Sequence, residues 1–563
     1  MLRLTVAVHL LHLLSGPALG AQAKISAGPS FHHALIMLGS TAEDRLRLGH
    51  LIGDRSTYGF LIRSPSALSG FDTQRRAEQG EDARGLYWAT FAPELHTVWN
   101  SDLPYSLNEG ALWAGRGLST RLTVGGWLRF RGATLVLAPQ IVHERNRDFQ
   151  TFAFPGPGAE TRHALSSPFH FPPGSMDLPQ RFGYEPRSFV DAGQSSLTVH
   201  RGSVAFGVAT ENLWWGPGIR NALLMSSHAP GIPHIFVGTA RPVETRLGAL
   251  EARWMVGRLT ESGYFDFDPT NDHRSLSGLV LVLSPSFDRS LSVGFARTVY
   301  APSGSIPLSA AFDAFRSVGR PSQVPGDTLI APSPDQIFSL FARWAFPEAG
   351  FEAYGEWGRF EQPAGIRDLL EVPNHSRGYT VGLQYARPLA SLSAALRFQV
   401  EVTNLEPSTS YRVRPFGEWY ASRAVPQGYT HRGRVLGASI GPSGSSQWLA
   451  TDIFGEAWTV GGFVGRIRWE NQARFTYTPE FRRSDLSLMT GMRGSRELGP
   501  LTIAAQYTRT ARLNYLFQSE PITPVDDRGV DIVNHTVTFT FSTGSLSAMG
   551  GLFRETTPST PRP

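Results

Sequence analysis

The residues best suited to chemistry lie between Glu211 and Pro233, where two adjacent tryptophans stand among polar side chains. Trp214 and Trp215 follow an alternating run, Leu197 to Thr210, so in extended chain their indoles face opposite sides. The neighbouring polar residues are Asn212, Arg220, Asn221, Ser226, Ser227 and His228. Indole planes beside amide and guanidinium groups suit a sugar, which has apolar C–H faces and a rim of hydroxyls. The segment therefore predicts ligand contacts from Asn212, Trp214, Trp215, Arg220, Asn221 and His228.

The same segment also has a purely structural interpretation, which the sequence leaves open. Gly216, Pro217 and Gly218 form a motif that forces a tight, rigid bend in the chain. Paired aromatics at such a turn commonly serve as packing. On this interpretation the two tryptophans fill an interface or a lumen.

Signatures of catalysis are absent from the sequence. It has no Gly-x-Ser-x-Gly elbow, His-Glu-x-x-His pair or phosphate-binding loop. The acidic run from Asp266 to His273 could hold Ca²⁺, but a solvated loop explains it better. Glu352 and Glu356 share one strand face and could serve glycoside hydrolysis, but the lining of a lumen explains them better. We expect no catalytic residues, no cofactor and no bound metal.

Composition bounds the class of protein. The 563 residues include no Cys, which excludes disulfides and thiolate metal sites. The net charge is +5 and Lys24 is the only lysine, so almost all positive charge is arginine. Arginine grips carboxylates and phosphates bidentately, so acidic glycans or lipopolysaccharide phosphates are reasonable partners, although base-composition bias would also enrich arginine. We expect no nucleic-acid partner.

The N-terminus predicts export. Arg3 provides a positive region, Leu4 to Leu14 an apolar core, and Ala21-Gln22-Ala23 a small-x-small cleavage site. We assign residues 1–23 to a cleaved signal peptide, with a cut at Gly20 as the alternative. No other stretch is long and apolar enough to span a bilayer as a helix.

Residues 24–115 differ from the rest of the chain. Thr41 to Asp44 is typical of a helix start, and the following leucines repeat partly at helical spacing. We predict a small N-terminal α-helical periplasmic subdomain there. Residues 554–563, rich in Pro and Thr, are predicted to be a disordered tail.

Residues 116–553 alternate with a period of two. The clearest strand, Ser391 to Thr403, has Leu396, Phe398 and Val400 on one face and Arg397, Gln399 and Glu401 on the other. Roughly 16–18 such segments occur, each about ten residues long, as in tilted membrane-spanning strands. In a membrane barrel the apolar face meets lipid and the polar face lines the lumen. We therefore predict an all-β transmembrane barrel of antiparallel strands with long extracellular loops, and we expect it to be a monomer.

Several motifs resemble the capsule-assembly Wzi-like outer-membrane family. They are the Asn-Leu-Trp-Trp-Gly-Pro-Gly block, the segment from Leu223 to Pro233, and the run from Leu247 to Phe267. Arg45 to Leu48 and Arg63 to Pro65 are similar in order. The resemblance implies about 18 strands, a helical periplasmic subdomain, a lumen blocked by loops, and a non-enzymatic surface lectin. The motif itself carries over to Trp214, Trp215, Gly216, Pro217 and Gly218, whereas His228 stands where many relatives have Asn.

Two functions therefore stay open. The first is a lectin of the outer membrane that binds or organises exported capsular or other polysaccharide at the cell surface, with outer-membrane lipid, lipopolysaccharide and the barrel-insertion machinery as further partners. The second is a porin or gated channel for sugars or oligosaccharides. Steady conductance in planar bilayers would favour the channel.

Overall fold

The computed structural model describes most of the chain. The described residues are 35–52, 59–70, 86–152, 161–170, 175–303, 308–315, 334–360, 366–389, 393–414, 417–473, 484–499, 501–518 and 530–543. The predicted signal peptide and the predicted tail lie outside these residues, as does the end of the predicted barrel at 545–553.

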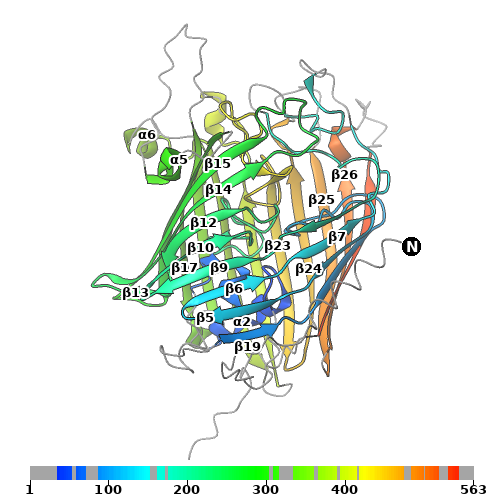
Figure 1. Cartoon of the computed structure of the whole chain (residues 1–563). Coiled ribbons are helices and arrows are strands. Elements are labelled where there is room, and N and C mark those ends of the chain that lie inside the picture. The colour runs from blue at the N-terminus through cyan, green and yellow to red at the C-terminus, as the bar shows by residue number, and fades with distance from the viewer. Residues whose placement is uncertain are drawn as a thin grey trace, which may run out of the picture.

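The described strands close into one antiparallel barrel (Figure 1). Its sheet contains 23 strand segments, five of which continue a preceding segment across a short interruption, so that 18 strands build the wall. The barrel closes where β27 (Ile532–Ser542) pairs with β3 (Glu94–Asn100), in a register that sets Thr536 opposite Asn100. This result confirms the predicted fold class.

The five interrupted strands are β2 (Leu86–Thr90) with β3, β4 (Gly117–Thr123) with β5 (Gly126–Phe130), β6 (Ala133–Leu137) with β7 (Gln140–Glu144), β8 (Arg187–Asp191) with β9 (Ser196–Arg201), and β12 (His234–Thr239) with β13 (Val243–Glu244). The uninterrupted strands are β10 (Val204–Ala209), β14 (Gly248–Thr260), β15 (His273–Pro285), β16 (Leu291–Pro302), β17 (Asp335–Phe346), β18 (Phe351–Arg359), β19 (Arg377–Leu389), β20 (Ala394–Asn404), β23 (Ser445–Gly455), β24 (Trp458–Trp469), β25 (Asp485–Leu498), β26 (Leu501–Leu513) and β27.

Local sequence explains the first four interruptions. Pro93 and Pro139 lack the N–H that a ladder needs. Gly125 has φ 152°, and a Cβ there would lie 1.8 Å from the carbonyl oxygen of Leu137. Gly193 has φ 62°, a left-handed conformation that glycine adopts at little cost. Four neighbouring strands of the wall are therefore interrupted between their two segments.

The two faces of the wall have the inverted polarity that lipid requires. In β20, Arg397, Gln399 and Glu401 are each 1% exposed, whereas their apolar neighbours lie on the outer face. Large apolar side chains point outward elsewhere too, including Leu118 at 49% and Val190 at 72% exposure. Such a surface is stable only against an apolar solvent. The predicted transmembrane character of the barrel is confirmed.

The barrel begins earlier than the sequence indicated. β2 and β3 pair with β5, β27 and β4, so residues 86–100 are part of the wall. The predicted boundary between a subdomain at 24–115 and a barrel from 116 is therefore wrong. The turns around Asn100 obscured the strand, because its alternation is short and Pro93 breaks it.

The two ends of the barrel differ. At one end, here called the short-turn end, adjacent strands join through pairs of residues such as 131–132, 202–203 and 456–457. At the other, the long-loop end, the connections include 101–116, 145–186, 210–233 and 405–444. The long-loop end also carries α5 (Leu308–Ala311) and α6 (Ile366–Glu371) (Figure 1). No helix of the described residues is long and apolar enough to cross a membrane.

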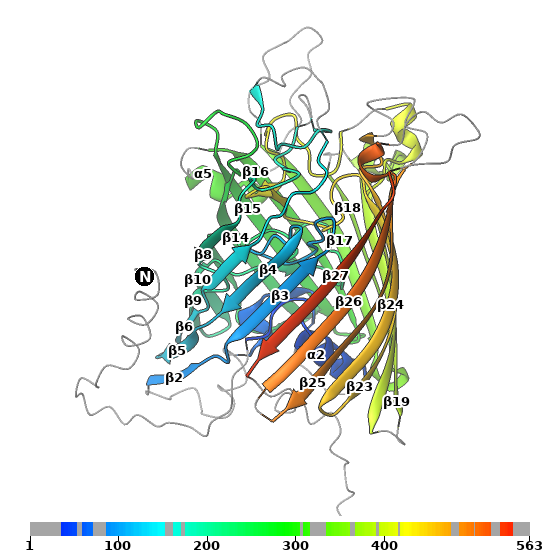
Figure 2. The same ribbon diagram turned by 90° about the vertical axis from the view of Figure 1, so that its right-hand side faces the viewer.

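The N-terminal segment lies inside the barrel. Its helix α2 (Thr41–Leu51) is the predicted one, capped by Ser40, whose side chain accepts from the Glu43 N–H. Figure 2 shows α2 behind the strands, near the short-turn end. Arg45 donates there to the backbone carbonyls of Gly455, Glu456 and Trp458. A strand β1 (Ile62–Arg63) and a short helix α3 (Pro65–Leu68) follow it. Residues 35–52 and 59–70 thus act as an internal plug, here called the N-terminal plug.

Candidate functional site

The segment from Glu211 to Pro233, here called the tryptophan segment, enters the barrel from the long-loop end and contacts the N-terminal plug. Trp214 and Trp215 form the short strand β11, which pairs with β1 so that Arg63 is opposite Trp214 and Ile62 is opposite Trp215. This contact joins two parts of the chain that come from opposite ends of the barrel. The plug and the tryptophan segment therefore contact each other inside the barrel.

The two indoles face opposite sides, as the extended chain predicts. Trp214 packs with Phe60, Leu68 and Ala222 and is 1% exposed. Trp215 is fully buried in the main apolar cluster, and a Cβ added to Gly278 would lie 2.7 Å from its ring. Among the described residues, neither indole nitrogen has a hydrogen-bond partner. Much of the role of Trp215 is therefore packing, as the structural interpretation holds.

Arginines of the plug hold the Gly216-Pro217-Gly218 bend. Arg63 donates to the carbonyls of Gly216, at 3.2 Å, and Gly218, at 2.5 Å. Arg47 donates to the carbonyl of Pro217 at 2.9 Å. Gly216 has φ 106°, and a Cβ on it would lie 3.0 Å from a carboxylate oxygen of Glu356. The carbonyls of the bend therefore bind the guanidinium groups of Arg47 and Arg63, and Gly216 has no room for a side chain.

Carboxylates of the wall hold the residues after the bend. Glu401 accepts from the backbone N–H groups of Ile219, Arg220 and Asn221 at 2.6, 3.0 and 2.9 Å. Glu356 accepts from the N–H of Leu223 at 3.0 Å. Such charge-assisted bonds are about twice as strong as neutral ones.

Glu352, the other predicted lumen carboxylate, binds Arg47 at 2.7 Å and also pairs with Arg343. Both glutamates of β18 therefore face the interior, as predicted, and each has a structural partner.

A cavity of about 290 Å³ remains between the plug and the wall. On the side formed by β25, β26 and β27, the cavity is lined mainly by side chains with hydroxyl or amide groups. They are Ser495, Thr502, Gln506, Thr536, Thr538, Thr540 and Ser542. Its other sides come from α2, from the loop 105–110 and from the tryptophan segment. A concave site with many hydroxyls and a few charges can replace the water around a sugar with hydrogen bonds.

Most charged groups of the cavity are paired. His96 and Glu109 lie 2.8 Å apart, Arg493 and Asp452 also 2.8 Å, and Asp44 binds Arg397 at 2.8 Å. Burial raises the pKa of Glu109, but the positive charges of His96, Arg121 and Arg434 outweigh it and lower the pKa to about 2. Glu109 is therefore a carboxylate at neutral pH.

Arg220 differs from these groups. Its guanidinium lies 4.2 Å from the centre of the Trp448 ring and makes no hydrogen bond or ion pair within the described chain. Burial lowers its pKa from the usual value, although arginine still keeps its charge at neutral pH. A half-buried guanidinium with free donors, stacked on an indole, is a ready receptor for a carboxylate or phosphate.

The structure divides the six predicted contact residues into two groups. Asn212, Trp214 and Arg220 line the cavity. Trp215 lies in the main apolar cluster, and Asn221 is bonded to Ser446 and Ser439. His228 is buried, and that burial, aided by Arg434, lowers its pKa well below the usual value, so it is neutral.

Sequence reasoning missed the residues that hold the segment in place. Glu401 lies about 180 residues from the backbone groups it accepts from, so no local pattern shows the contact. Trp448, which stacks under Arg220, gives no signal in sequence either. The polar face of β27 was readable, because Thr536, Thr538 and Thr540 alternate with apolar residues.

Comparisons with known proteins agree with this architecture. The model of the capsule assembly protein Wzi family matches residues 184–451. No curated protein sequence matches the chain. Among solved structures, the chain is similar to Wzi, an outer membrane protein involved in group 1 capsule assembly in Escherichia coli and a carbohydrate-binding β-barrel. The two chains are 10% identical, and the alignment covers 90% of this chain and 95% of the Wzi chain with a TM-score of 0.53.

Two further structures share less with the chain. One is OccK7 (OpdD) of Pseudomonas aeruginosa, with 10% identity, coverage of 81% of this chain and 99% of that chain, and a TM-score of 0.37. The other is OccAB2 of Acinetobacter baumannii, with 8% identity, coverage of 80% of this chain and 97% of that chain, and a TM-score of 0.37. The match at 184–451 includes the whole tryptophan segment and its bend. The family match at 184–451 and the similar fold of Wzi therefore confirm the resemblance to the capsule assembly protein Wzi family that the sequence predicted.

Proposed function

We propose that this protein is an outer-membrane β-barrel that binds exported polysaccharide, of capsular or related type, and holds it at the cell surface. It does so without catalysis and without conducting the polymer. The family match and the carbohydrate-binding Wzi barrel of similar fold support the choice of ligand. The apolar outer wall supports the membrane location.

The observation that carries the proposal is the contact between the N-terminal plug and the tryptophan segment inside the barrel. The plug enters from the short-turn end, the tryptophan segment enters from the long-loop end, and they pair at β1 and β11. The segment 405–444 adds Trp419, Tyr420 and Tyr429 to the same apolar cluster. An interior filled to this extent favours binding over passage, which sets the protein apart from a porin.

Two sets of groups are available for the polymer. At the long-loop end, Arg145, Arg147, Arg412 and Arg423 are exposed, and no ion pair within the described residues occupies them. In the interior, Arg220 and the hydroxyl wall form a site for a short sugar segment. Weak contacts at several points gain strength on a repeating polymer, because each bound unit raises the local concentration of the next.

The direct test is polysaccharide binding by purified protein, together with retention of polysaccharide by cells that lack the gene. Arg220→Ala should weaken binding of an acidic oligosaccharide at least about tenfold, since a charge-assisted contact contributes about 1.5–3 kcal/mol. Arg289→Ala is the matched control, because Arg289 is exposed and pairs only with Glu244. Deleted cells that keep all their surface polysaccharide would contradict the proposal.

A further inference from the structure

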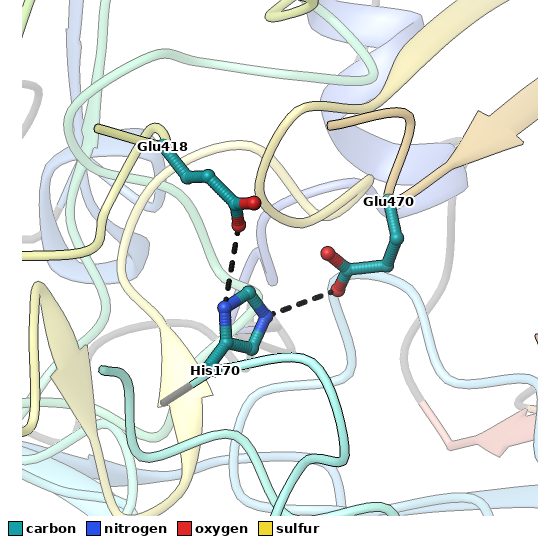
Figure 3. Close-up of side chains that lie close together, drawn as sticks. All are labelled: His170, Glu418 and Glu470. Atoms are coloured by element: carbon teal, nitrogen blue, oxygen red, sulfur yellow. Dashed lines mark hydrogen bonds and ion pairs between the residues drawn. The ribbon is translucent and has the colours of Figure 1, made fainter. Parts of the chain in front are cut away.

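Three loops of the long-loop end bring a histidine and two glutamates together. His170 comes from the connection 145–186, Glu418 from 405–444, and Glu470 directly follows β24. His170 Nδ1 lies 3.3 Å from a carboxylate oxygen of Glu418, and His170 Nε2 lies 3.3 Å from one of Glu470 (Figure 3). Nothing in the polysaccharide-binding role uses this cluster.

The cluster is buried and its charges do not balance. His170 is 1% exposed, and the side chains of Glu418 and Glu470 are 10% and 15% exposed. Neither glutamate has an ion pair with an arginine within the described chain. Two carboxyl groups therefore face one imidazole, so the cluster contains one more acidic group than basic groups. Buried charge of this kind calls for a further cation.

One atom of the cluster is left without a partner in the described part of the chain. His170 Nδ1 and Glu418 Oε2 face each other as an ion pair at 3.3 Å. Glu470 Oε2 is buried and makes no hydrogen bond within the described residues. Native structures leave few buried polar atoms unsatisfied, and a bound ion is one of the ordinary explanations.

Both contacts of His170 are longer than an ideal charge-assisted hydrogen bond, although the contact between Nε2 and Glu470 is still within hydrogen-bond distance. A charge-assisted N–H···O bond spans about 2.7–2.9 Å, which is shorter than both contacts. Ligands at about 2.0–2.2 Å around a tetrahedral zinc ion lie roughly 3.3–3.6 Å apart. One ligand atom from each residue can be chosen so that all three lie within 4.8 Å of one another. Because an imidazole binds an ion through one nitrogen and the two carboxylates contact different ring nitrogens, metal binding requires one carboxylate to move to the other side of the ring.

The donor set selects the class of metal. Ca²⁺ and Mg²⁺ take oxygen ligands, so the imidazole disfavours them. One histidine nitrogen with two carboxylate oxygens suits zinc and related divalent ions and leaves a position for water. We propose that His170, Glu418 and Glu470 bind one divalent transition-metal ion of the zinc class, which fastens three loops of the long-loop end to one another.

A proton is the competitor for this site. Burial disfavours the charged imidazole, but Glu470 and Glu418 outweigh burial and raise the pKa of His170 to about 10. In metal-free protein the imidazole is therefore protonated at neutral pH, and a metal ion has to displace one proton.

The test uses the full chain, purified in detergent with a tag that contains no histidine and stripped of metal with a chelator. Titration with zinc chloride in a calorimeter should give one site, and the unfolding temperature should rise with zinc and fall again with chelator. His170→Ala and Glu470→Gln should lose both effects. His143→Ala is the control and should keep them, since His143 is exposed and its ring nitrogen bonds only Ser188.

Two results would overturn the proposal. One is zinc binding by His170→Ala with wild-type affinity and stoichiometry. The other is wild-type protein that binds no zinc, in which case the cluster is a protonated histidine between two carboxylates. Glu470→Gln keeps the size of the side chain, so it reports on the site even if His170→Ala does not fold. Conductance and polysaccharide binding do not enter this test, so its outcome is independent of the proposed function.

Discussion

The guanidinium of Arg63 lies 4.9 Å from the centre of the Trp214 ring, and the two residues are backbone partners in the β1–β11 ladder. Arg63 also pairs with Glu43 at 2.7 Å and is 4% exposed. One side chain therefore binds α2, the glycine bend and the indole together.

Arg63→Ala should destabilise the barrel strongly. It would leave Glu43 and two backbone carbonyls without their cation, and removal of one partner from a buried pair costs about 3–5 kcal/mol. Urea unfolding of the protein in detergent would measure the loss. The matched control is Arg289→Ala, whose pair with Glu244 has side chains 49% and 70% exposed and should change stability by less than about 1 kcal/mol. Equal effects of the two substitutions would contradict the role given to Arg63.

Substitutions of Trp214 and Trp215 should have different effects on stability and on ligand affinity. Trp215→Ala removes a fully buried ring and should cost about 3–5 kcal/mol of unfolding free energy. It should leave the affinity of the folded protein for acidic oligosaccharide unchanged, because Trp215 does not line the cavity. Trp214→Ala should lower both quantities. A larger loss of affinity in Trp215→Ala than in Trp214→Ala would reverse the assignment.

The segments packed inside the barrel predict low conductance. Wild-type protein in planar bilayers should show no steady open current, because the plug and the tryptophan segment meet inside the barrel. Glu401→Gln removes the charge that holds three consecutive N–H groups and should increase brief openings. Glu244→Gln, at an exposed site, should behave as wild type. A stable open level in wild-type protein would favour the sugar channel instead.

Low pH should remove the contribution of Glu109 to the stability of the folded protein. Its pKa is lowered to about 2 in the folded protein from 4.5, so its contribution to stability is complete above pH 4.5 and is lost as the pH falls towards 2. The unfolding temperature of wild-type protein should therefore fall more steeply across this window than that of Glu109→Gln. Parallel curves for the two proteins would show that the pairing with His96 does not stabilise the fold.

The sequence predicted the wall well because its signal is local. A strand such as β20 alternates Arg397, Gln399 and Glu401 with apolar residues, and the period of two survives whatever the neighbours are. The first strand escaped detection because Pro93 divides it into two short pieces. The helix α2 was readable from its acidic first turn at Glu43 and Asp44.

The site was less predictable, because long-range contacts decide the role of each residue. Trp214 and Trp215 look alike in sequence, yet one lines a cavity and the other fills the apolar cluster. Asn221 and Arg220 are neighbours, yet only the arginine has a free side chain. These differences depend on Ser446 and Trp448, which belong to a distant strand.

The ladder between β1 and β11 also limits the order in which the molecule can assemble. Residues 62–63 precede the first wall strand in the chain, whereas residues 214–215 follow the fifth, so the ladder forms only when both pieces occupy the interior. The seam between β3 and β27 joins the first and last described strands and is necessarily late. An insertion intermediate whose seam has not yet closed would expose the arginines of the N-terminal plug, and trapping that species would show whether the interior is filled before the cylinder is sealed.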